Sequence, residues 1–370
     1  MRPPRVAVVI TRLEGGAGVL ALRGALALAP EDGAVTLVCG SGGRLLDRAR
    51  RAGLPVVVEP SLRRPISPGH DLRALVRLVR LLAGFDVVHT HCAKAGALGR
   101  VAARCAGVRR VVHTFHGFAF HEFQPRVRRR CYLAVERALG RITDLALCVG
   151  NGVAAEAARR ELLPPARIRA TRVAVDRGAP TADDDARRKA RRALGLDPRD
   201  VVVGAVGRVT YQKSPEDFVA ALERLDRPDV VGVWIGGGDL LPRVRELSER
   251  SPADVRWVGE RTDVPELLPA FDVFVLPSRY EGLPLSVVEA MVCGVPVVAS
   301  AVNSVGDVVT HGETGVLVPP RRPAALCSAV AHLLDHPRDA ALLAERARRS
   351  IDDRYGEPAL ASALADAYQP

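Results

Sequence analysis

Short apolar runs rich in β-branched residues recur along the chain, and the segments between them carry apolar residues at helical spacing. Six runs occupy the first half: VAVVI (6–10), VTLVC (35–39), PVVVE (55–59), DVVHT (86–90), RVVHTF (110–115) and LALCV (145–149). Helical spacing is clearest before the fourth run, where one face would carry Leu72, Leu75, Val76, Val79 and Leu82. Strands that are apolar on both faces and alternate with helices predict a parallel α/β sheet.

The pattern changes between residues 179 and 200, where the chain reads APTADDDARRKARRALGLDPRD. This polar segment, with prolines near both ends, predicts a connection followed by the first helix of a second domain. The run Asp183-Asp184-Asp185 is typical of a solvated loop or a helix cap, and a metal site is the less favoured interpretation.

A second alternation then begins, with runs at VVVGAVG (201–207), VVGVWIG (230–236), VRWVG (255–259), DVFVLP (272–277), VPVVAS (295–300) and GVLVP (315–319). The tail from Pro323 to Pro370 is almost wholly helical in pattern. We therefore predict three parts: a Rossmann-like acceptor-binding domain (1–178), a Rossmann-like donor-binding domain (179–350), and a C-terminal helix (351–370) that packs on the first domain. Open sheets of this kind bind ligands beyond the carboxyl ends of their strands, so we expect the active site in a cleft between the domains.

Size and composition agree with two domains. The chain has 370 residues, which is longer than a domain with a single core usually is. Hydrophobic residues make up 48% of it, enough for two cores. No apolar run reaches the roughly 18 residues of a membrane-spanning helix, and the first apolar run is too short for a secretion signal. We expect a cytoplasmic protein. The seven cysteines form no C-x-x-C pair, which predicts reduced, buried thiols: Cys39, Cys92, Cys105, Cys131, Cys148, Cys293 and Cys327.

The formal charge of +11 comes almost entirely from arginine, because only Lys94, Lys189 and Lys213 are lysines. Such an excess suits a nucleic acid, an anionic membrane or a phosphorylated ligand. Aromatic residues make up only 4% of the chain, too few for the stacking platforms of single-stranded nucleic-acid binders. An arginine-rich composition throughout the source genome would give the same excess without any polyanionic partner.

The stretch RYEGLPLSVVEAMVCGVPVVAS (279–300) is the most informative. Its pattern predicts a strand that ends at Pro277, a loop, and a helix with Pro284 in its first turn and Gly294 at its end. The N–H groups of Gly282 and Leu283 would then suit a phosphate. Glu289, more than one turn inside the apolar helix, needs hydrogen-bond donors, and a ribose offers two hydroxyls.

These residues resemble the E-x7-E motif of retaining glycosyltransferases with the GT-B fold, specifically family 4. The resemblance places Glu281 beside the donor sugar and Glu289 on the ribose of the nucleotide, with the turn Gly282-Leu283-Pro284 at the donor. It implies the fold as well: two Rossmann-like domains that face a central cleft, with the C-terminal helices crossing back to the first domain.

A second segment, VGRVTYQKSPEDF, follows the first strand of the second half and is similar to the glycine-arginine-lysine segment of that family. The resemblance gives Gly207, Arg208 and Lys213 a place at the donor diphosphate. Guanidinium and ammonium groups can neutralise a pyrophosphate as the sugar leaves. Lys213 is the more informative of the two cations, because lysine is so rare in this chain.

The segment RVVHTFHGFAFH (110–121) looks like the T-x-H-G segment of many polysaccharide-building members, and the resemblance places His116 beside the donor sugar. We interpret the neighbouring histidines as ordinary strand-end residues: His89, His91, His113 and His121. A zinc site made of His113, His116 and His121 is conceivable, but its spacing matches no recognised motif. We expect no metal site.

Glycine-rich segments complete the resemblance. Gly15 and Gly16 are similar to the loop that approaches the leaving phosphate and the acceptor, and Gly237 and Arg261 match segments around the base or ribose. The run Gly15-Gly16-Ala17-Gly18 is not G-x-G-x-x-G, which disfavours a nicotinamide enzyme. The chain departs from the family at TRVAVD (171–176), near the interdomain turn, and at Gly18-Val19, where an acidic residue is usual.

The resemblance implies transfer of a sugar from a UDP- or GDP-sugar to an acceptor hydroxyl, with retention and without a cofactor. The acceptor would be a saccharide, a lipid-linked sugar or a small natural product. No D-x-D motif stands at a strand end, so we expect metal-independent transfer. A basic, partly apolar helix predicted within residues 123–141 fits peripheral contact with an anionic membrane, and equally a helix packed on the sheet with its arginines in water.

Two other functions remain as alternatives. A nucleotide-sugar epimerase of the same architecture would turn over donor without any acceptor. A nucleic-acid-binding protein would bind any duplex in a salt-sensitive way, but that interpretation leaves the paired glutamates and the Arg208–Lys213 spacing without a role. We expect no nucleic-acid partner.

Overall fold

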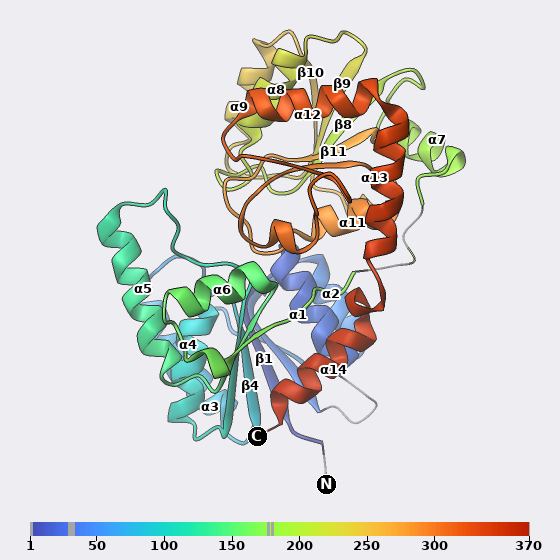
Figure 1. Cartoon of the computed structure of the whole chain (residues 1–370). Helices are drawn as coiled ribbons and strands as arrows, with labels where there is room; N and C mark the ends of the chain where they lie inside the picture. The colour runs from blue at the N-terminus through green and yellow to red at the C-terminus, as the bar shows by residue number, and fades with distance from the viewer. Residues whose placement is uncertain (1–2, 29–33, 176–177, 179–180, 370) are drawn as a thin grey trace. The chain divides into compact units, whose positions relative to one another are not determined.

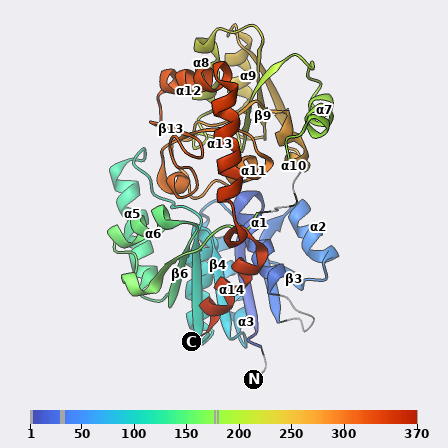
Figure 2. The same ribbon diagram turned by 45° about the vertical axis from the view of Figure 1, so that its right-hand side comes forward.

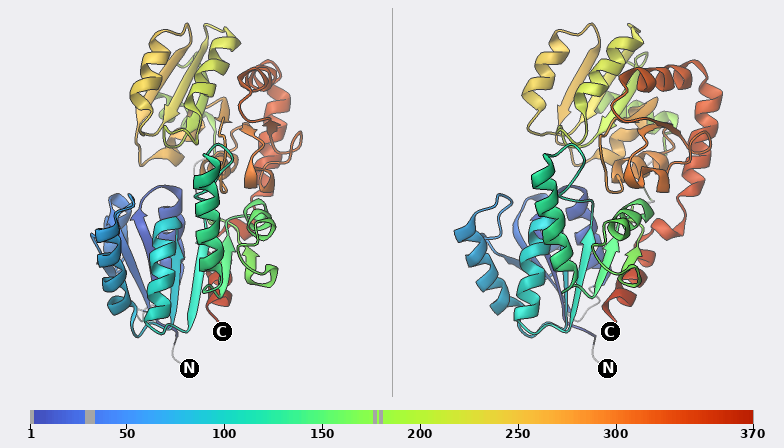
Figure 3. Two further views of the ribbon diagram at one scale, coloured as in Figure 1. Left: turned by 90° about the vertical axis from the view of Figure 1, so that its left-hand side faces the viewer. Right: turned by 60° about the vertical axis from the view of Figure 1, so that its left-hand side comes forward.

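The chain forms two compact units, each built on a parallel sheet. A computed structural model describes residues 3–28, 34–175, 178 and 181–369. One unit, here called unit 1, comprises Met1–Ala174 and Asp353–Pro370, and the other, unit 2, comprises Val175–Asp352. Helices lie on both sides of the strands in each unit (Figure 3). The predicted pair of Rossmann-like α/β domains is confirmed.

Unit 1 contains a seven-stranded sheet in the order β3-β2-β1-β4-β5-β6-β7. All six runs predicted as strands in this half are strands, and the sheet order reverses between β1 and β4. The seventh strand was missed because it is only three residues long and two of them are exposed. The strands are β1 (Val6–Leu13), β2 (Val35–Gly42), β3 (Val56–Val58), β4 (Val87–His91), β5 (Arg110–Phe115), β6 (Leu145–Cys148) and β7 (Ile168–Ala170).

Helices cover this sheet, and most of them connect consecutive strands. They are α1 (Gly15–Ala27), α2 (Arg44–Arg51), α3 (Pro68–Leu82), α4 (Ala93–Cys105), α5 (Arg126–Gly140) and α6 (Asn151–Arg159), with short 3-10 turns at Pro165–Arg167 (η1) and Asp353–Tyr355 (η4). Helix α3 packs Leu75, Val79 and Leu82 on the core as predicted, but the prediction was wrong for Leu72 and Val76. Its buried residues are Ala74, Leu78 and Leu82, whereas Leu72 and Val76 are 64% and 44% exposed. The helix has more apolar positions than the sheet and α4 can cover.

The C-terminal helix α14 (Glu357–Tyr368) belongs to unit 1 and packs against α1 (Figures 1 and 2). Its buried residues Leu360 and Leu364 lie one turn apart. Gly24 on α1 leaves room for this contact, because a Cβ there would lie 2.8 Å from Leu364 Cδ1. The Arg110 guanidinium also donates to the Ala367 carbonyl at 3.1 Å. The predicted return of the C-terminal helix to the first domain is confirmed.

Unit 2 contains a six-stranded sheet in the order β10-β9-β8-β11-β12-β13, which reverses between β8 and β11. The strands match the six predicted runs: β8 (Val201–Val206), β9 (Val230–Ile235), β10 (Asp254–Gly259), β11 (Val273–Leu276), β12 (Val297–Ser300) and β13 (Val316–Val318). Phe218 and Trp234, packed edge to face at 5.4 Å, anchor the core between this sheet and its helices.

The helices of unit 2 are α7 (Asp184–Ala193), α8 (Pro215–Leu225), α9 (Leu241–Glu249), α10 (Val264–Leu267), α11 (Leu285–Cys293), α12 (Pro323–Asp335) and α13 (Pro337–Ser350), with 3-10 turns at Leu268–Ala270 (η2) and Asn303–Asp307 (η3). The Asp183 carboxylate accepts the Ala186 N–H at 2.8 Å and caps α7. This confirms the helix-cap interpretation of the acidic run.

The cysteines follow the prediction only in part. Cys39, Cys148 and Cys293 are buried thiols, but Cys105 and Cys131 are exposed because α4 and α5 carry them on their solvent sides. Within the described parts of the chain, no helix has the length and hydropathy needed to cross a membrane.

Candidate active site

The predicted site residues fall into two sets, one in each unit. His116, Gly15 and Gly16 belong to unit 1, and the remaining residues belong to unit 2. Gly15 and Gly16 follow β1, Lys213 follows β8 and Glu281 follows β11, which are strands at which the sheet order reverses. His116, Gly237 and Arg261 follow β5, β9 and β10 instead. A crevice forms at such a reversal because the connections leave in opposite directions, which makes it the usual ligand site of an open α/β sheet.

In unit 2, the loop after β8 and the loop after β11 meet through a buried ion pair. Lys213 Nζ lies 2.7 Å from Glu281 Oε1, and Glu281 is only 7% exposed. The sequence suggested separate contacts for these residues, the diphosphate for Lys213 and the sugar for Glu281. In the structure they contact each other directly.

Three further residues hold Glu281, and the sequence analysis singled out none of them. Ser278 Oγ donates to Glu281 Oε1 at 2.6 Å, and Gln212 Nε2 donates to Oε2 at 3.2 Å. The Glu281 N–H donates to Asn303 Oδ1 at 2.9 Å. Such donors compensate the cost of burying a carboxylate. A sequence signal exists for two of them: Gln212 adjoins Lys213, and Ser278 follows the predicted strand end.

The turn after β8 determines where Lys213 lies. Gly207 has φ of +152°, and its carbonyl accepts the Trp234 indole N–H at 2.8 Å. A Cβ on Gly207 would lie 3.0 Å from Lys213 Cε, so the lysine side chain runs close against this glycine. Ser214 adopts a left-handed conformation at the start of α8, and its hydroxyl donates to Asp217 at 2.6 Å.

The same turn contacts the β11 loop through Arg279. The Arg279 guanidinium stacks on the Tyr211 ring at 4.1 Å, and the Arg279 N–H donates to the Gln212 carbonyl at 2.8 Å. Arg208 is exposed nearby. Burial raises the pKa of Tyr280 above its ordinary value, and the charge of Glu281 adds to the shift while Arg208 and Arg279 oppose it.

Gly237 and Arg261 lie on the adjoining loops after β9 and β10. The Gly237 carbonyl accepts the Val209 N–H at 2.8 Å, so the β9 loop is joined to the β8 loop. Arg261 forms a forked pair with Asp263, with Nε–Oδ1 at 2.8 Å and Nη2–Oδ2 at 2.5 Å. This hydrogen-bonded pair lowers the pKa of Asp263 and raises that of Arg261. Contact of either residue with a nucleotide stays a prediction.

Helix α11 begins one residue later than predicted. Pro284 is its N-cap, with ψ of 108°, so the first helical residue is Leu285. Gly294 ends the helix in a left-handed conformation, as predicted. Within the described residues, the N–H groups of Gly282 and Leu283 have no hydrogen-bond acceptor. Glu289 is half-buried more than a turn inside α11 and adds to the effect of burial in raising the pKa of Cys293 to about 12.

In unit 1, His116 follows β5 and contacts the end of β4. His116 Nε2 lies 2.8 Å from His91 Nδ1, a pairing that the interpretation of His91 as an ordinary strand-end residue missed. His89 and His113 are buried at 2% and 1% exposure within the sheet. No group of three or more His, Cys, Asp or Glu in the described residues is placed to hold a metal ion.

Gly15 and Gly16 are not in a loop, contrary to the prediction. Strand β1 continues to Leu13 and α1 begins at Gly15, so the connection shrinks to Glu14. Gly15 has φ of +62°, which glycine adopts without strain. Both glycines are exposed at the start of the helix.

Comparison with known proteins assigns the family. Residues 14–178 match the model described as Glycosyltransferase Family 4, and residues 200–336 match the model described as Glycosyl transferases group 1. The UDP-Gal:alpha-D-GlcNAc-diphosphoundecaprenol alpha-1,3-galactosyltransferase of Escherichia coli is 34% identical over 299 residues, 77% of this chain and 76% of the relative. The chain belongs to glycosyltransferase family 4.

Two other comparisons agree with this family. The GDP-mannose-dependent alpha-(1-6)-phosphatidylinositol monomannoside mannosyltransferase of Mycolicibacterium smegmatis is 30% identical, over 84% of this chain and 82% of the relative. The crystal structure of Anabaena HepE in complex with UDP and glucose superimposes with a TM-score of 0.85 over 98% of both chains, at 20% identity, and shares the fold. The protein is therefore a glycosyltransferase of GT-B architecture, and the epimerase alternative is not favoured.

Proposed function

We propose that this glycosyltransferase moves a sugar from a UDP- or GDP-sugar to an acceptor hydroxyl with retention at the anomeric carbon. The observation that carries the proposal is the Lys213–Glu281 pair, which joins the loops after β8 and β11 where the sheet order of unit 2 reverses. A cation and a carboxylate held together at such a reversal suit a ligand that combines phosphates with sugar hydroxyls.

Each residue then has a distinct role. Arg208 and Lys213 neutralise the charge that develops on the diphosphate as the sugar leaves, and the free N–H groups of the turn before α11 add to this stabilisation. Glu281 accepts hydrogen bonds from the donor sugar, and Glu289 accepts them from the ribose. The hydrogen bond to Glu281 positions the Lys213 ammonium group for the donor.

His116 and the start of α1 complete the proposal in unit 1. His116 contacts the donor sugar, while Gly15 and Gly16 approach the leaving phosphate and the acceptor. The leaving diphosphate itself takes the proton of the acceptor hydroxyl on the face from which it departs. In this scheme the protein cations supply the charge neutralisation, so transfer needs neither a divalent metal nor a cofactor, and the rate in EDTA should equal the rate without it.

The acceptor is a saccharide, a lipid-linked sugar or a small natural product, as the names of the relatives suggest for those proteins. Helix α5 supports peripheral contact with an anionic membrane. It buries Glu136 and Leu139 but exposes Val127 (74%) and Val135 (50%) among exposed arginines. Apolar side chains beside arginines are the surface that an anionic bilayer attracts.

The donor assignment can be tested by thermal shift with UDP, GDP, ADP and TDP, followed by the corresponding sugar nucleotides. A ligand that binds only the folded protein increases the free energy of unfolding, by about 2.7 kcal/mol when its concentration is one hundred times its Kd. The melting temperature rises as a result. We expect a shift with UDP or GDP and none with the other two. No shift with any nucleotide diphosphate would contradict the proposal.

Retention can be tested on the donor that this panel identifies. Slow hydrolysis of an α-linked sugar nucleotide, followed by proton NMR at early times, should release the α-anomer before mutarotation. Initial release of the β-anomer would contradict the retaining mechanism.

A further inference from the structure

The His91–His116 contact in unit 1 is a hydrogen bond between two imidazole rings. His91 is the last residue of β4, and His116 stands just beyond the end of the neighbouring strand β5. Their nitrogens, Nδ1 of His91 and Nε2 of His116, are 2.8 Å apart. At this distance one nitrogen carries the hydrogen and the other offers a lone pair.

Both rings are neutral near pH 7. Desolvation lowers the pKa of His116 to about 4, and it lowers that of His91 well below the ordinary value, with further lowering from the charged forms of His89, His116 and His113. A neutral imidazole has one N–H and one lone pair, so the tautomer of one ring dictates the tautomer of the other.

The arrangement fits one tautomer best. If His116 carries its hydrogen on Nε2, it donates to His91 Nδ1, and His91 then also carries its own hydrogen on Nε2. Free neutral histidine favours the Nε2–H form, so this assignment leaves both rings in their preferred state. The opposite assignment requires the less favoured Nδ1–H form in both. The favoured pair leaves His116 Nδ1 as a hydrogen-bond acceptor.

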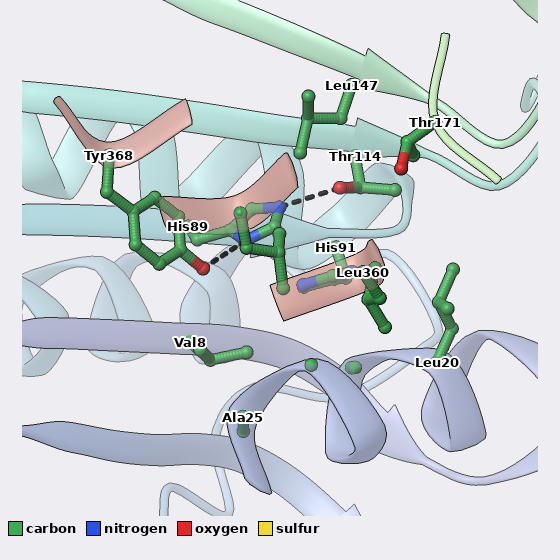
Figure 4. A pocket seen from close by; sticks show the side chains of 13 residues that line it. Val8, Leu20, Ala25, His89, His91, Thr114, Leu147, Thr171, Leu360 and Tyr368 are labelled. Carbon is green, nitrogen blue, oxygen red and sulfur yellow. Dashed lines mark hydrogen bonds between the residues drawn. The ribbon is translucent and has the colours of Figure 1, made fainter. Parts of the chain in front are cut away.

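His91 packs against His89 of the same strand, which is itself held by residues from two other elements. It is 4% exposed, and its ring lies 4.2 Å from that of His89. His89 in turn bonds Thr114 of β5 through Nε2 at 2.6 Å and the Tyr368 hydroxyl of α14 through Nδ1 at 2.8 Å (Figure 4). The C-terminal helix therefore supports the ring against which His91 packs, and this packing restricts rotation of the His91 ring.

We propose that His91 is a positioning residue that holds His116 in the Nε2–H tautomer, with Nδ1 presented as an acceptor for a substrate hydroxyl. The functional part rests on the proposed contact of His116 with the donor sugar. The tautomer and its cause are properties of the ligand-free protein, so they can be measured without any substrate.

The first test is NMR of the full-length protein labelled with nitrogen-15 on histidine, with His116 assigned by the variant His116→Gln. We expect the Nε2–H pattern for His116 and a scalar coupling across the hydrogen bond between His116 Nε2 and His91 Nδ1. An Nδ1–H pattern, or the absence of this coupling, would overturn the proposal. This measurement needs no substitution at His91.

The second test compares His91→Asn with His91→Leu. The asparagine amide can replace Nδ1 as the partner of His116, whereas leucine fills the space without a polar atom. We expect His91→Asn to keep the Nε2–H tautomer of His116 and a kcat within about threefold of wild type. His91→Leu should mix the tautomers and lower kcat about tenfold, which is about 1.4 kcal/mol, with donor KM within twofold.

The two hypotheses fail differently in these experiments. An unchanged His116 tautomer in His91→Leu would overturn the positioning role, whatever the activity. A wild-type rate in His116→Gln, with the tautomer still dependent on His91, would support the positioning and contradict the proposed role of His116 in the transfer reaction.

Discussion

At the residue scale, Glu281 is a buried carboxylate that is almost fully occupied by protein donors. Lys213 and Ser278 share one of its oxygens and Gln212 takes the other. A buried ion pair contributes little net stability by itself, because desolvation offsets the attraction, but the loss of one partner is costly. This network therefore serves to fix the position of the Glu281 and Lys213 side chains more than to stabilise the fold.

Replacing Ser278, which is fully buried, tests that interpretation. Ser278→Ala removes one hydrogen bond to a charged group but leaves Lys213 and Gln212 in place. We expect kcat/KM to fall about threefold to tenfold, because the Glu281 carboxylate gains freedom to rotate. Steady-state kinetics with the identified donor measures the effect. The control is Ser328→Ala, which removes an exposed hydroxyl on α12 and should leave the rate unchanged. Equal kinetics for both variants would show that Ser278 does not position Glu281.

At the element scale, the C-terminal segment stabilises unit 1 although it is the last part of the chain. Helix α14 packs against α1 and places the Tyr368 hydroxyl on His89. The helix thus connects the packing of the fold with the histidines at the ends of β4 and β5. Loss of α14 should weaken both.

A cavity-forming substitution on α14 tests this packing. Leu364 is 5% exposed, so Leu364→Ala should lower the free energy of unfolding of unit 1 by about 2–4 kcal/mol, through lost burial and an unfilled cavity. Urea unfolding followed by circular dichroism measures the change. Leu342→Ala on α13 is the matched control, because Leu342 is 44% exposed and should cost well under 1 kcal/mol. A similar loss in both variants would contradict the packing role of α14.

The buried histidines make stability depend on pH. Desolvation, with a smaller contribution from charged His116, lowers the pKa of His89 from 6.5 to about 3. Between these two pH values His89 is protonated in the unfolded chain but neutral in the folded protein. Its contribution to stability is complete above pH 6.5 and is lost as the pH falls toward 3, at up to about 1.4 kcal/mol per pH unit. The melting temperature should fall between pH 7.5 and 5.5, less steeply in His89→Asn and as steeply in the control His332→Asn. An unchanged slope in His89→Asn would contradict the account.

The sequence predicted the strands well, because runs such as VAVVI and DVFVLP are buried on both faces and no other element suits them. Lys213 and Glu281 were singled out because their segments resemble motifs of the family, and Lys213 also because lysine is rare in this chain. Their direct contact was not, because it depends on the sheet order, which places β8 beside β11. Leu72 and Val76 of α3 were misjudged because apolar residues surround more than one side of that helix. The contact of His91 with His116 was missed because it depends on a ring just beyond the end of the neighbouring strand.

At the scale of the whole molecule, the charge of +11 is distributed over arginines that are mostly exposed, and they accompany exposed apolar residues on α5, as they also do on α3 and α9. The Lys213–Glu281 network uses one lysine and no net charge. We propose that the excess serves contact with an anionic membrane, because few aromatic residues are present to stack on the bases of a single-stranded nucleic acid.

Liposome flotation tests the membrane contact. The protein should float with vesicles that contain anionic lipid at low salt and dissociate at high salt. Arg126→Glu/Arg130→Glu reverses two exposed charges on α5 and should weaken binding at least about tenfold, since each basic residue contributes about 1 kcal/mol near the surface. Arg243→Glu/Arg245→Glu makes the same charge change on α9 and should still float. Equal loss in both doubles would show that only net charge matters.

We propose above all that the loops after β8 and β11 bind two linked phosphoryl groups through Lys213. The most direct measurement is calorimetric titration with a nucleoside diphosphate and the matching monophosphate, in the wild type, in Lys213→Ala and in the exposed control Lys189→Ala. We predict at least about tenfold tighter binding of the diphosphate in the wild type and the control, equal to about 1.4 kcal/mol, and loss of that preference in Lys213→Ala. An undiminished preference in Lys213→Ala would contradict the claim.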